Sequence, residues 1–110
     1  PAHPDHEVSV ELEGLLSSAR DARGERLEVV RVPAPRTLED EDGIVDWSYI
    51  NHLVVNDGVV ACTYDDPQDA ASLAVLEKAY AGRQVVGVDA RPLFARGGGI
   101  HCITQQQPRV

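Results

Sequence analysis

Apolar residues recur at helical spacing in two segments of the chain. In the first, the pattern follows Asp5 and stops before Gly24, a residue that can end a helix in the left-handed conformation. In the second, Asp66 can cap a helix with Pro67 at its first position, and the pattern stops at Gly82. We therefore expect one helix over residues 6–22 and another between residues 66 and 82.

Short runs rich in valine predict the strands. Asn56-Asp57-Gly58 separates two such runs and tolerates positive φ, which predicts a β-hairpin. Pro33 and Pro35 end an earlier run, because proline cannot continue a central strand. The strands we expect are residues 27–32, 49–55, 59–64, 85–88 and 100–104.

A weak internal repeat relates the two halves of the chain. A helix, a glycine, an arginine and a Val-Val pair occur in this order through Val29-Val30 and again through Val85-Val86. In the second copy the hairpin precedes the helix, which gives the order ββαβ. Such a module cannot bury both faces of its sheet alone, so neighbouring modules are expected. The predicted class is α/β.

Charge and hydropathy narrow the class of partner. The formal net charge is −8 and no basic stretch carries aromatic neighbours, which argues against nucleic acid but does not oppose a cationic substrate. The apolar runs are far shorter than the roughly 20 residues of a membrane span, so no membrane is expected as a partner. Two cysteines make no disulfide framework, although they could pair, and a cytoplasmic location is expected. The chain opens on Pro1 without a start residue and reads as part of something longer.

Cys102 is the candidate nucleophile. It follows three consecutive glycines, residues 97–99, which permit a tight turn that presents the thiol. The alternative is a small buried hydrophobe, which is the interpretation we give to Cys62 in its apolar strand.

Two groups of residues are candidates for a metal site. His3 and His6 flank Pro4-Asp5, but a frayed polar terminus explains them as well. Residues 39–42 form an acidic cluster, for which a solvated surface turn is the alternative to a metal site. We expect no metal.

Two further pairs could contact a substrate. Asp89 and Arg91 follow a predicted strand, where we prefer the interpretation as a surface ion pair. Asn51 and Trp47 lie near the predicted hairpin, where we prefer packing to a contact with the substrate.

The segment 97–108 reads Gly-Gly-Gly-Ile-His-Cys-Ile-Thr-Gln-Gln-Gln-Pro and resembles the C-terminal signature of agmatine deiminases and the related bacterial, Porphyromonas-type peptidyl-arginine deiminases. The resemblance continues upstream in the same order and covers essentially the whole chain. The upstream matches are residues 48–51, 56–58, 66–70 and 85–91.

The resemblance implies the pentein fold, an α/β propeller of ββαβ modules, of which this chain would supply about one and a half: the end of one module over residues 1–35 and the last module over 47–110. It also implies a hydrolase that acts on a C–N bond of a guanidine without a cofactor. It makes Cys102 the nucleophile, with Gly98 and Gly99 beside the substrate. Agmatine and water would give N-carbamoylputrescine and ammonia through a thiouronium intermediate. Partners would be agmatine, the remainder of the propeller and, as an open alternative, a second copy of the chain.

The histidine and carboxylates of the family's active site find no matching motif in these 110 residues, so we expect no turnover by the chain alone. His101 would face away from Cys102 on an extended strand, so we interpret it as a residue that steadies the turn. Peptidyl-arginine deiminase activity, or a non-catalytic fragment or interaction module, is the alternative function.

Three positions depart from the family pattern. Asn is common where Gly99 stands, Phe where His52 stands and Gly where Asp65 stands. The glycine form at 99 also occurs in the family. We expect His52 and Asp65 to change a packing surface relative to the family pattern.

Overall fold

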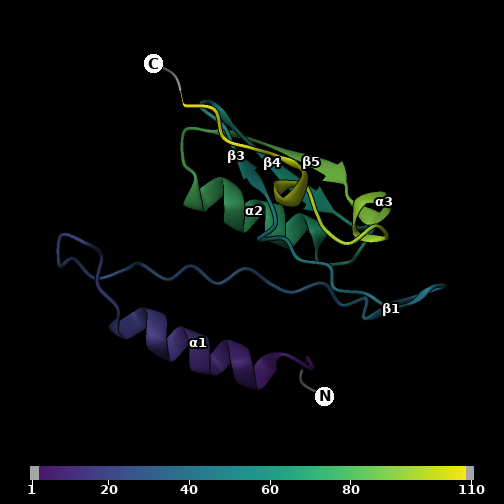
Figure 1. Ribbon diagram of the computed structural model, residues 1–110, viewed down its shortest axis with the longest axis horizontal. Coiled ribbons are helices and arrows are strands. Elements are labelled where there is room, and N and C mark those ends of the chain that lie inside the picture. The colour runs from purple at the N-terminus through teal and green to yellow at the C-terminus, as the bar shows by residue number, and fades with distance from the viewer. Residues whose placement is uncertain (1–2, 109–110) are drawn as a thin grey trace. The chain divides into compact units, whose positions relative to one another are not determined.

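The computed structural model describes residues 3–108 and falls into two compact units, Pro1–Arg31 and Val32–Val110, each of which is described by itself. The first unit holds helix α1. The second unit holds all the strands and the remaining helices (Figure 1). In chain order the elements are α1 (His6–Ser18), β1 (Glu39–Asp40), β2 (Gly43–Ile44), β3 (Leu53–Val54), β4 (Gly58–Thr63), α2 (Asp69–Ala79), β5 (Gln84–Asp89), α3 (Arg91–Phe94) and a 3-10 turn (His101–Ile103).

The second unit is built on a mixed three-stranded sheet in the order β3-β4-β5. β3 and β4 pair antiparallel through the Asn-Asp-Gly turn, where the Val55 N–H donates to the Gly58 carbonyl at 2.9 Å. β4 and β5 pair parallel, because α2 carries the chain back between them. The α/β class is confirmed, and the element order from β3 to β5 is the ββαβ order that the sequence predicts.

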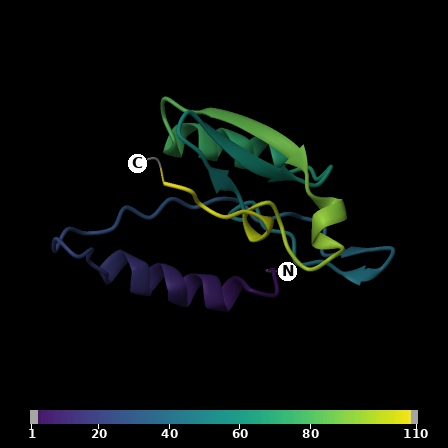
Figure 2. The same cartoon turned by 45° about the horizontal axis from the view of Figure 1, so that its top comes forward.

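The two faces of this sheet have different neighbours. α2 lies along one face (Figure 2), where a Cβ on Gly87 would come within 3.1 Å of the Leu73 side chain. Successive side chains of a strand point to opposite faces, so Cys62 and its ladder partner Val88 lie on the other face. That second face carries the main core, and the chain after β5 packs on it.

The main core is small and largely aromatic. Trp47 stacks on Tyr64 with ring centroids 5.0 Å apart, and Phe94 meets Tyr64 edge-on at 5.5 Å. Such pairs add about 0.5–1.5 kcal/mol beyond the burial of their area. The buried members are Tyr49, Cys62, Tyr64, Ala90, Phe94 and Ile100. The predicted core position of Cys62 is therefore confirmed.

The first unit departs from the predicted helix and strand. α1 ends at Ser18 rather than residue 22, because the Asp21 carboxylate accepts the backbone N–H groups of Arg23 and Glu25 at 2.8 and 2.9 Å. This local bonding competes with the helix ladder, and Gly24 turns with φ 82° inside the resulting loop. Residues 27–32 form no strand, so that prediction is wrong; a short β-rich run makes a strand only where a neighbouring strand completes its ladder.

Two predictions in the second unit are also wrong in extent or type. β3 covers only Leu53–Val54, because residues 48–51 form a turn in which Asn51 N–H donates to the Ser48 carbonyl at 3.2 Å. Residues 100–104 were expected to be a strand, but His101–Ile103 is a 3-10 turn. The predicted strand over 85–88 is confirmed as β5.

The polar candidates outside the main core lie on the surface. Asp89 and Arg91 form the predicted ion pair at 2.8 Å, with both side chains about half exposed. The acidic cluster forms the hairpin β1–β2 with its side chains exposed. Within residues 3–108 no three His, Cys, Asp or Glu side chains gather as a metal site would require. None of the helices in this part of the chain combines the length and hydropathy needed to cross a membrane.

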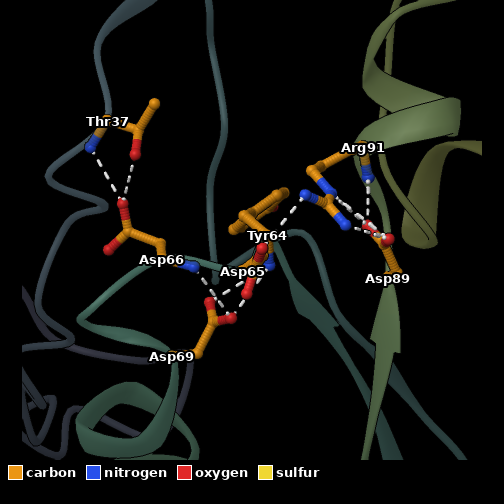
Figure 3. A network of polar contacts seen from close by, with 7 residues as sticks. All are labelled: Thr37, Tyr64, Asp65, Asp66, Asp69, Asp89 and Arg91. Atoms are coloured by element: carbon orange, nitrogen blue, oxygen red, sulfur yellow. Dashed lines mark hydrogen bonds and ion pairs between the residues drawn. The ribbon is translucent and has the colours of Figure 1, made fainter. Parts of the chain in front are cut away.

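Asp66 joins the loop before β1 to the start of α2 (Figure 3). Its buried carboxylate accepts N–H groups of Thr37 and Gln68 at 2.8 Å, the Thr37 hydroxyl at 2.7 Å, and the Arg36 N–H at 3.0 Å. These bonds explain why α2 begins at Asp69, two residues after the predicted first helical position at Pro67. Burial alone raises the pKa of Asp66, but the hydrogen bonds from Gln68, Thr37 and Arg36 outweigh it and hold the pKa below 3.8.

We predict that Asp66→Asn lowers the free energy of unfolding by about 2–3 kcal/mol at neutral pH. The NH₂ group of the asparagine amide would face N–H and O–H groups that now donate to the carboxylate, and two donors cannot bond to each other. The pKa of Asp66 is depressed on folding, so its stabilisation is complete above pH 3.8 and is lost as the pH falls through the lower folded value. Urea unfolding should therefore show a large gap between wild type and variant at pH 7 that narrows well below pH 3.8. A gap independent of pH would contradict this prediction, and Asp65→Asn is the exposed control.

Asp65 has φ 57°, the left-handed region that favours glycine, and this explains the glycine of the family pattern at this position. Its ion pair with Arg91 at 3.5 Å is exposed and contributes little. We predict that Asp65→Gly leaves the free energy of unfolding unchanged or raises it, whereas Asp65→Val lowers it by about 1–2 kcal/mol. Thermal unfolding of the two variants beside Asp65→Asn tests this, and equal effects of Gly and Val would contradict it.

Candidate functional site

A turn over residues 48–51 forms the first half of the site. The Tyr64 hydroxyl accepts the Ser48 N–H at 3.0 Å and donates to the Ser48 carbonyl at 2.8 Å. The next residue, Tyr49, is buried and donates its hydroxyl to Asp69 at 2.7 Å, at the start of α2. Burial raises the pKa of Tyr49 well above its usual range, so the hydroxyl keeps its proton as donor. The turn is thereby fixed to β4 and α2 just before Asn51.

The glycine-rich loop after α3 forms the second half of the site. Phe94 and Ile100 are buried on either side of it and anchor its ends in the main core. Gly97 turns the chain with φ 97°, which a residue with a side chain rarely adopts. A Cβ on Gly98 would lie 2.9 Å from Cys102 Cβ, and one on Gly99 would lie 2.6 Å from the Phe94 ring. The chain can approach itself this closely only because both residues are glycines.

Asn51 connects the two halves. Its Oδ1 accepts the backbone N–H of His101 at 2.9 Å, and its Nδ2 donates to Cys102 Sγ at 3.0 Å. Its own carbonyl accepts the Cys62 S–H at 3.0 Å from the core below. The 3-10 turn is closed from its other end, where the Thr104 hydroxyl donates to the His101 carbonyl at 2.8 Å. One side chain therefore sets the position of the Cys102 sulfur relative to the sheet.

The electrostatics of this arrangement favour a thiolate. The hydrogen bond from Asn51 and a second from the Gly99 backbone lower the pKa of Cys102, against smaller opposing effects that include Asp46. Cys102 is exposed, and it is a free thiol, as is the buried Cys62. A thiol that is both accessible and biased toward its anion has the two properties that a nucleophile needs.

An open depression lies beside Asn51 and His101. It is lined by Ser48, Ile50, Asn51 and His101 and has a volume of about 270 Å³. Ile50 is 70% exposed and gives this depression an apolar edge. A small molecule lying here would contact the Asn51 side chain that bonds to the cysteine.

The structure brings the predicted site residues together. It changes the reason for interpreting His101 as a residue that steadies the turn. Cys102, Gly98, Gly99 and His101 all belong to one loop. His101 was expected to point away from Cys102 because residues alternate along a strand, and that reason is wrong in a 3-10 turn, where successive residues differ by about 120°. Its ring lies 3.5 Å from the Gln106 amide. Its backbone N–H and carbonyl make the bonds to Asn51 and Thr104 that close the turn.

Asn51 is the residue that sequence reasoning undervalued, since packing was preferred for it over a role at the site. It lies 51 positions before Cys102, and no spacing rule connects the two. The only signal available was its place in the segment 48–51, which matches the family.

The whole described chain also matches known proteins. A family model described as Porphyromonas-type peptidyl-arginine deiminase matches residues 1–108. A protein of Streptomyces avermitilis that bears the provisional name agmatine deiminase is 56% identical over 109 residues, which cover 99% of this chain and 32% of the relative. An agmatine deiminase of Pseudomonas aeruginosa is 39% identical over 112 residues, covering 86% of this chain and 30% of the relative.

The fold comparison agrees with these relatives. The solved structure of an agmatine deiminase of Enterococcus faecalis superposes with a TM-score of 0.89 at 29% identity, over 97% of this chain and 34% of that one. The chain thus spans about a third of the length of the proteins it matches. On the match over residues 1–108, the chain belongs to the family of Porphyromonas-type peptidyl-arginine deiminases.

Proposed function

We propose that this chain supplies the nucleophile of a guanidine-hydrolysing enzyme whose substrate is agmatine. The observation that carries the proposal is the exposed Cys102 thiol, held by Asn51 beside an open depression and biased toward the thiolate. Relatives at 56% and 39% identity bear the name agmatine deiminase, which supports this substrate over other guanidines. The net charge of −8 is compatible with a cationic substrate.

In the proposed reaction the Cys102 thiolate adds to the guanidinium carbon of agmatine. A proton passes to one amino group, the C–N bond breaks, and ammonia leaves with the bonding electrons, so that a thiouronium remains on the sulfur. Water then adds to the same carbon and loses a proton. The C–S bond then breaks while the new hydroxyl loses its proton and becomes the urea carbonyl, which releases N-carbamoylputrescine and restores the thiolate. No cofactor is consumed in these steps.

The proton transfers need a group outside the loop of Cys102. Within residues 3–108 no histidine ring hydrogen-bonds to Cys102: the ring of His52 is bonded to Tyr49 and Tyr80, and that of His101 lies against Gln106. We therefore propose that an acid–base histidine and the carboxylates that hold the guanidinium come from further parts of a longer protein. These 110 residues alone would then give no turnover.

The finer description of the fold belongs to the same proposal. Val86 and Val88 on β5 are 47% and 42% exposed on the face that carries the main core. This surface supports a place for the ββαβ unit within a propeller of such modules, covered by its neighbours. If the chain were instead a non-catalytic interaction module, a partner protein or a second copy of this chain would cover the same valines.

The test is a chimera in which this chain replaces the matching segment of the Pseudomonas aeruginosa relative. We predict that the chimera folds and releases ammonia from agmatine, that Cys102→Ala in the chimera abolishes this release, and that the isolated chain gives none. A haloacetamidine should alkylate Cys102 in the chimera. A folded but inactive chimera, or an active Cys102→Ala chimera, would contradict the proposed function.

Peptidyl-arginine deiminase activity is the second candidate, because the family model carries that description. Competition between agmatine and a blocked arginine peptide in the chimera separates the two, and a preference for the peptide would overturn the proposed substrate.

We further propose that the lack of side chains at Gly98 and Gly99 lets this loop lie close to the substrate and also close to Cys102. We predict that Gly98→Ala in the chimera lowers turnover about ten- to a hundredfold, because its Cβ would displace a sulfur that must lie within attacking distance. Gly14→Ala is the matched control, since a Cβ there meets nothing within 4 Å. Equal activity of the two variants would show that the close approach at Gly98 does not matter.

A further inference from the structure

We infer that the Asp46 carboxylate binds the ammonium end of agmatine and thereby favours agmatine over a peptidyl-arginine. The inference rests on the proposed function for the chemistry at Cys102. Agmatine carries an ammonium group at the far end of its alkyl chain, whereas the arginine of a peptide carries neutral amide groups there. A carboxylate at that end of the site would attract the first substrate and not the second.

Asp46 lies where the chain enters the turn that lines the open depression. Ser48, which follows it closely, is one of the lining residues. The backbone is held on both sides of Asp46. The Val45 N–H donates to the Leu38 carbonyl at 3.0 Å, and the Ser48 N–H donates to the Tyr64 hydroxyl at 3.0 Å. The Asp46 side chain is exposed, so a fixed backbone carries a carboxylate that a ligand can reach.

The charge of Asp46 is free to act on a ligand. The ion pairs within residues 3–108 use other carboxylates. The hydrogen bonds from Asn51 and the Gly99 backbone lower the pKa of Cys102, and Asp46 opposes them. Among the charged side chains of the described residues, Asp46 has the largest effect on this thiol. A carboxylate that acts on the nucleophile in this way also attracts a cation toward it.

Ile50 offers a surface for the alkyl chain of the same substrate. It lines the depression, and its side chain is 70% exposed. Methylene groups that cover an exposed isoleucine remove apolar area from water, which favours binding. The depression of about 270 Å³ therefore combines an apolar edge with a nearby anion. These are the two features that an alkylammonium group needs.

The charge of a thiol reagent tests the effect of Asp46 without any turnover. A methanethiosulfonate transfers its alkylthio group to the Cys102 thiolate and releases methanesulfinate, so that a mixed disulfide forms. The aminoethyl reagent is a cation and the sulfonatoethyl reagent is an anion, and Cys62 is fully buried and does not compete. We predict that Asp46→Asn lowers the ratio of the two rates, cation over anion, about fivefold in the 110-residue chain. A change in the thiolate fraction cancels in this ratio.

Asp57→Asn is the matched control, because it removes the same charge from an exposed position in the turn between β3 and β4. Asp46→Glu keeps the charge and should keep the ratio of the wild type. An unmoved ratio in Asp46→Asn, or an equal change in Asp57→Asn, would overturn the inference.

The substrate provides the second test, in the chimera with the Pseudomonas aeruginosa relative. Butylguanidine has the alkyl chain of agmatine and lacks its ammonium group. We predict that Asp46→Asn raises the KM for agmatine about three- to fivefold more than the KM for butylguanidine. Equal changes for the two compounds would contradict the inference. A chimera without turnover would count against the proposed function, whereas the ratio of the methanethiosulfonate rates would still decide the role of Asp46.

Discussion

The side-chain amide of Asn51 joins two parts of the chain that lie 50 residues apart, and the geometry of the site depends on this contact. On one side it holds the backbone of His101, and on the other the sulfur of Cys102. Neither bond would form unless the turn at residues 48–51 were fixed first. The site is therefore a consequence of the main core and not of the glycine-rich loop alone.

The core fixes that turn through tyrosines. Tyr64 binds the backbone of Ser48 at both its N–H and its carbonyl, and Tyr49 reaches Asp69 at the start of α2. Buried hydroxyls need partners, and here those partners lie on segments that would otherwise be independent. The polar bonds in the core thus specify where the turn sits, while the aromatic rings supply the apolar area. In the same way, Asp66 holds the loop at Thr37 against α2 (Figure 3).

Local signals in the sequence were sufficient for the elements that depend on local chemistry. The Asn-Asp-Gly turn predicted the hairpin, and the Val-Val run predicted β5. The cysteine motif identified the loop and the family, which the match over residues 1–108 confirms. Predictions failed where the local structure depends on a contact with a residue far away in the sequence. Residues 100–104 turn because Phe94 and Ile100 are anchored in the core and Asn51 binds His101, and none of these contacts leaves a local pattern. The same reason explains why Asn51 was assigned to packing.

The most direct measurement is the pKa of the Cys102 thiol in the folded chain and in the same chain unfolded in urea, read from the thiolate absorbance of a variant in which Cys62 is replaced by alanine. If the contacts of Asn51 and the Gly99 backbone act on the sulfur as the structure shows, the pKa is lower in the folded chain. An equal or higher pKa in the folded chain would contradict the view that the fold prepares Cys102 as a nucleophile.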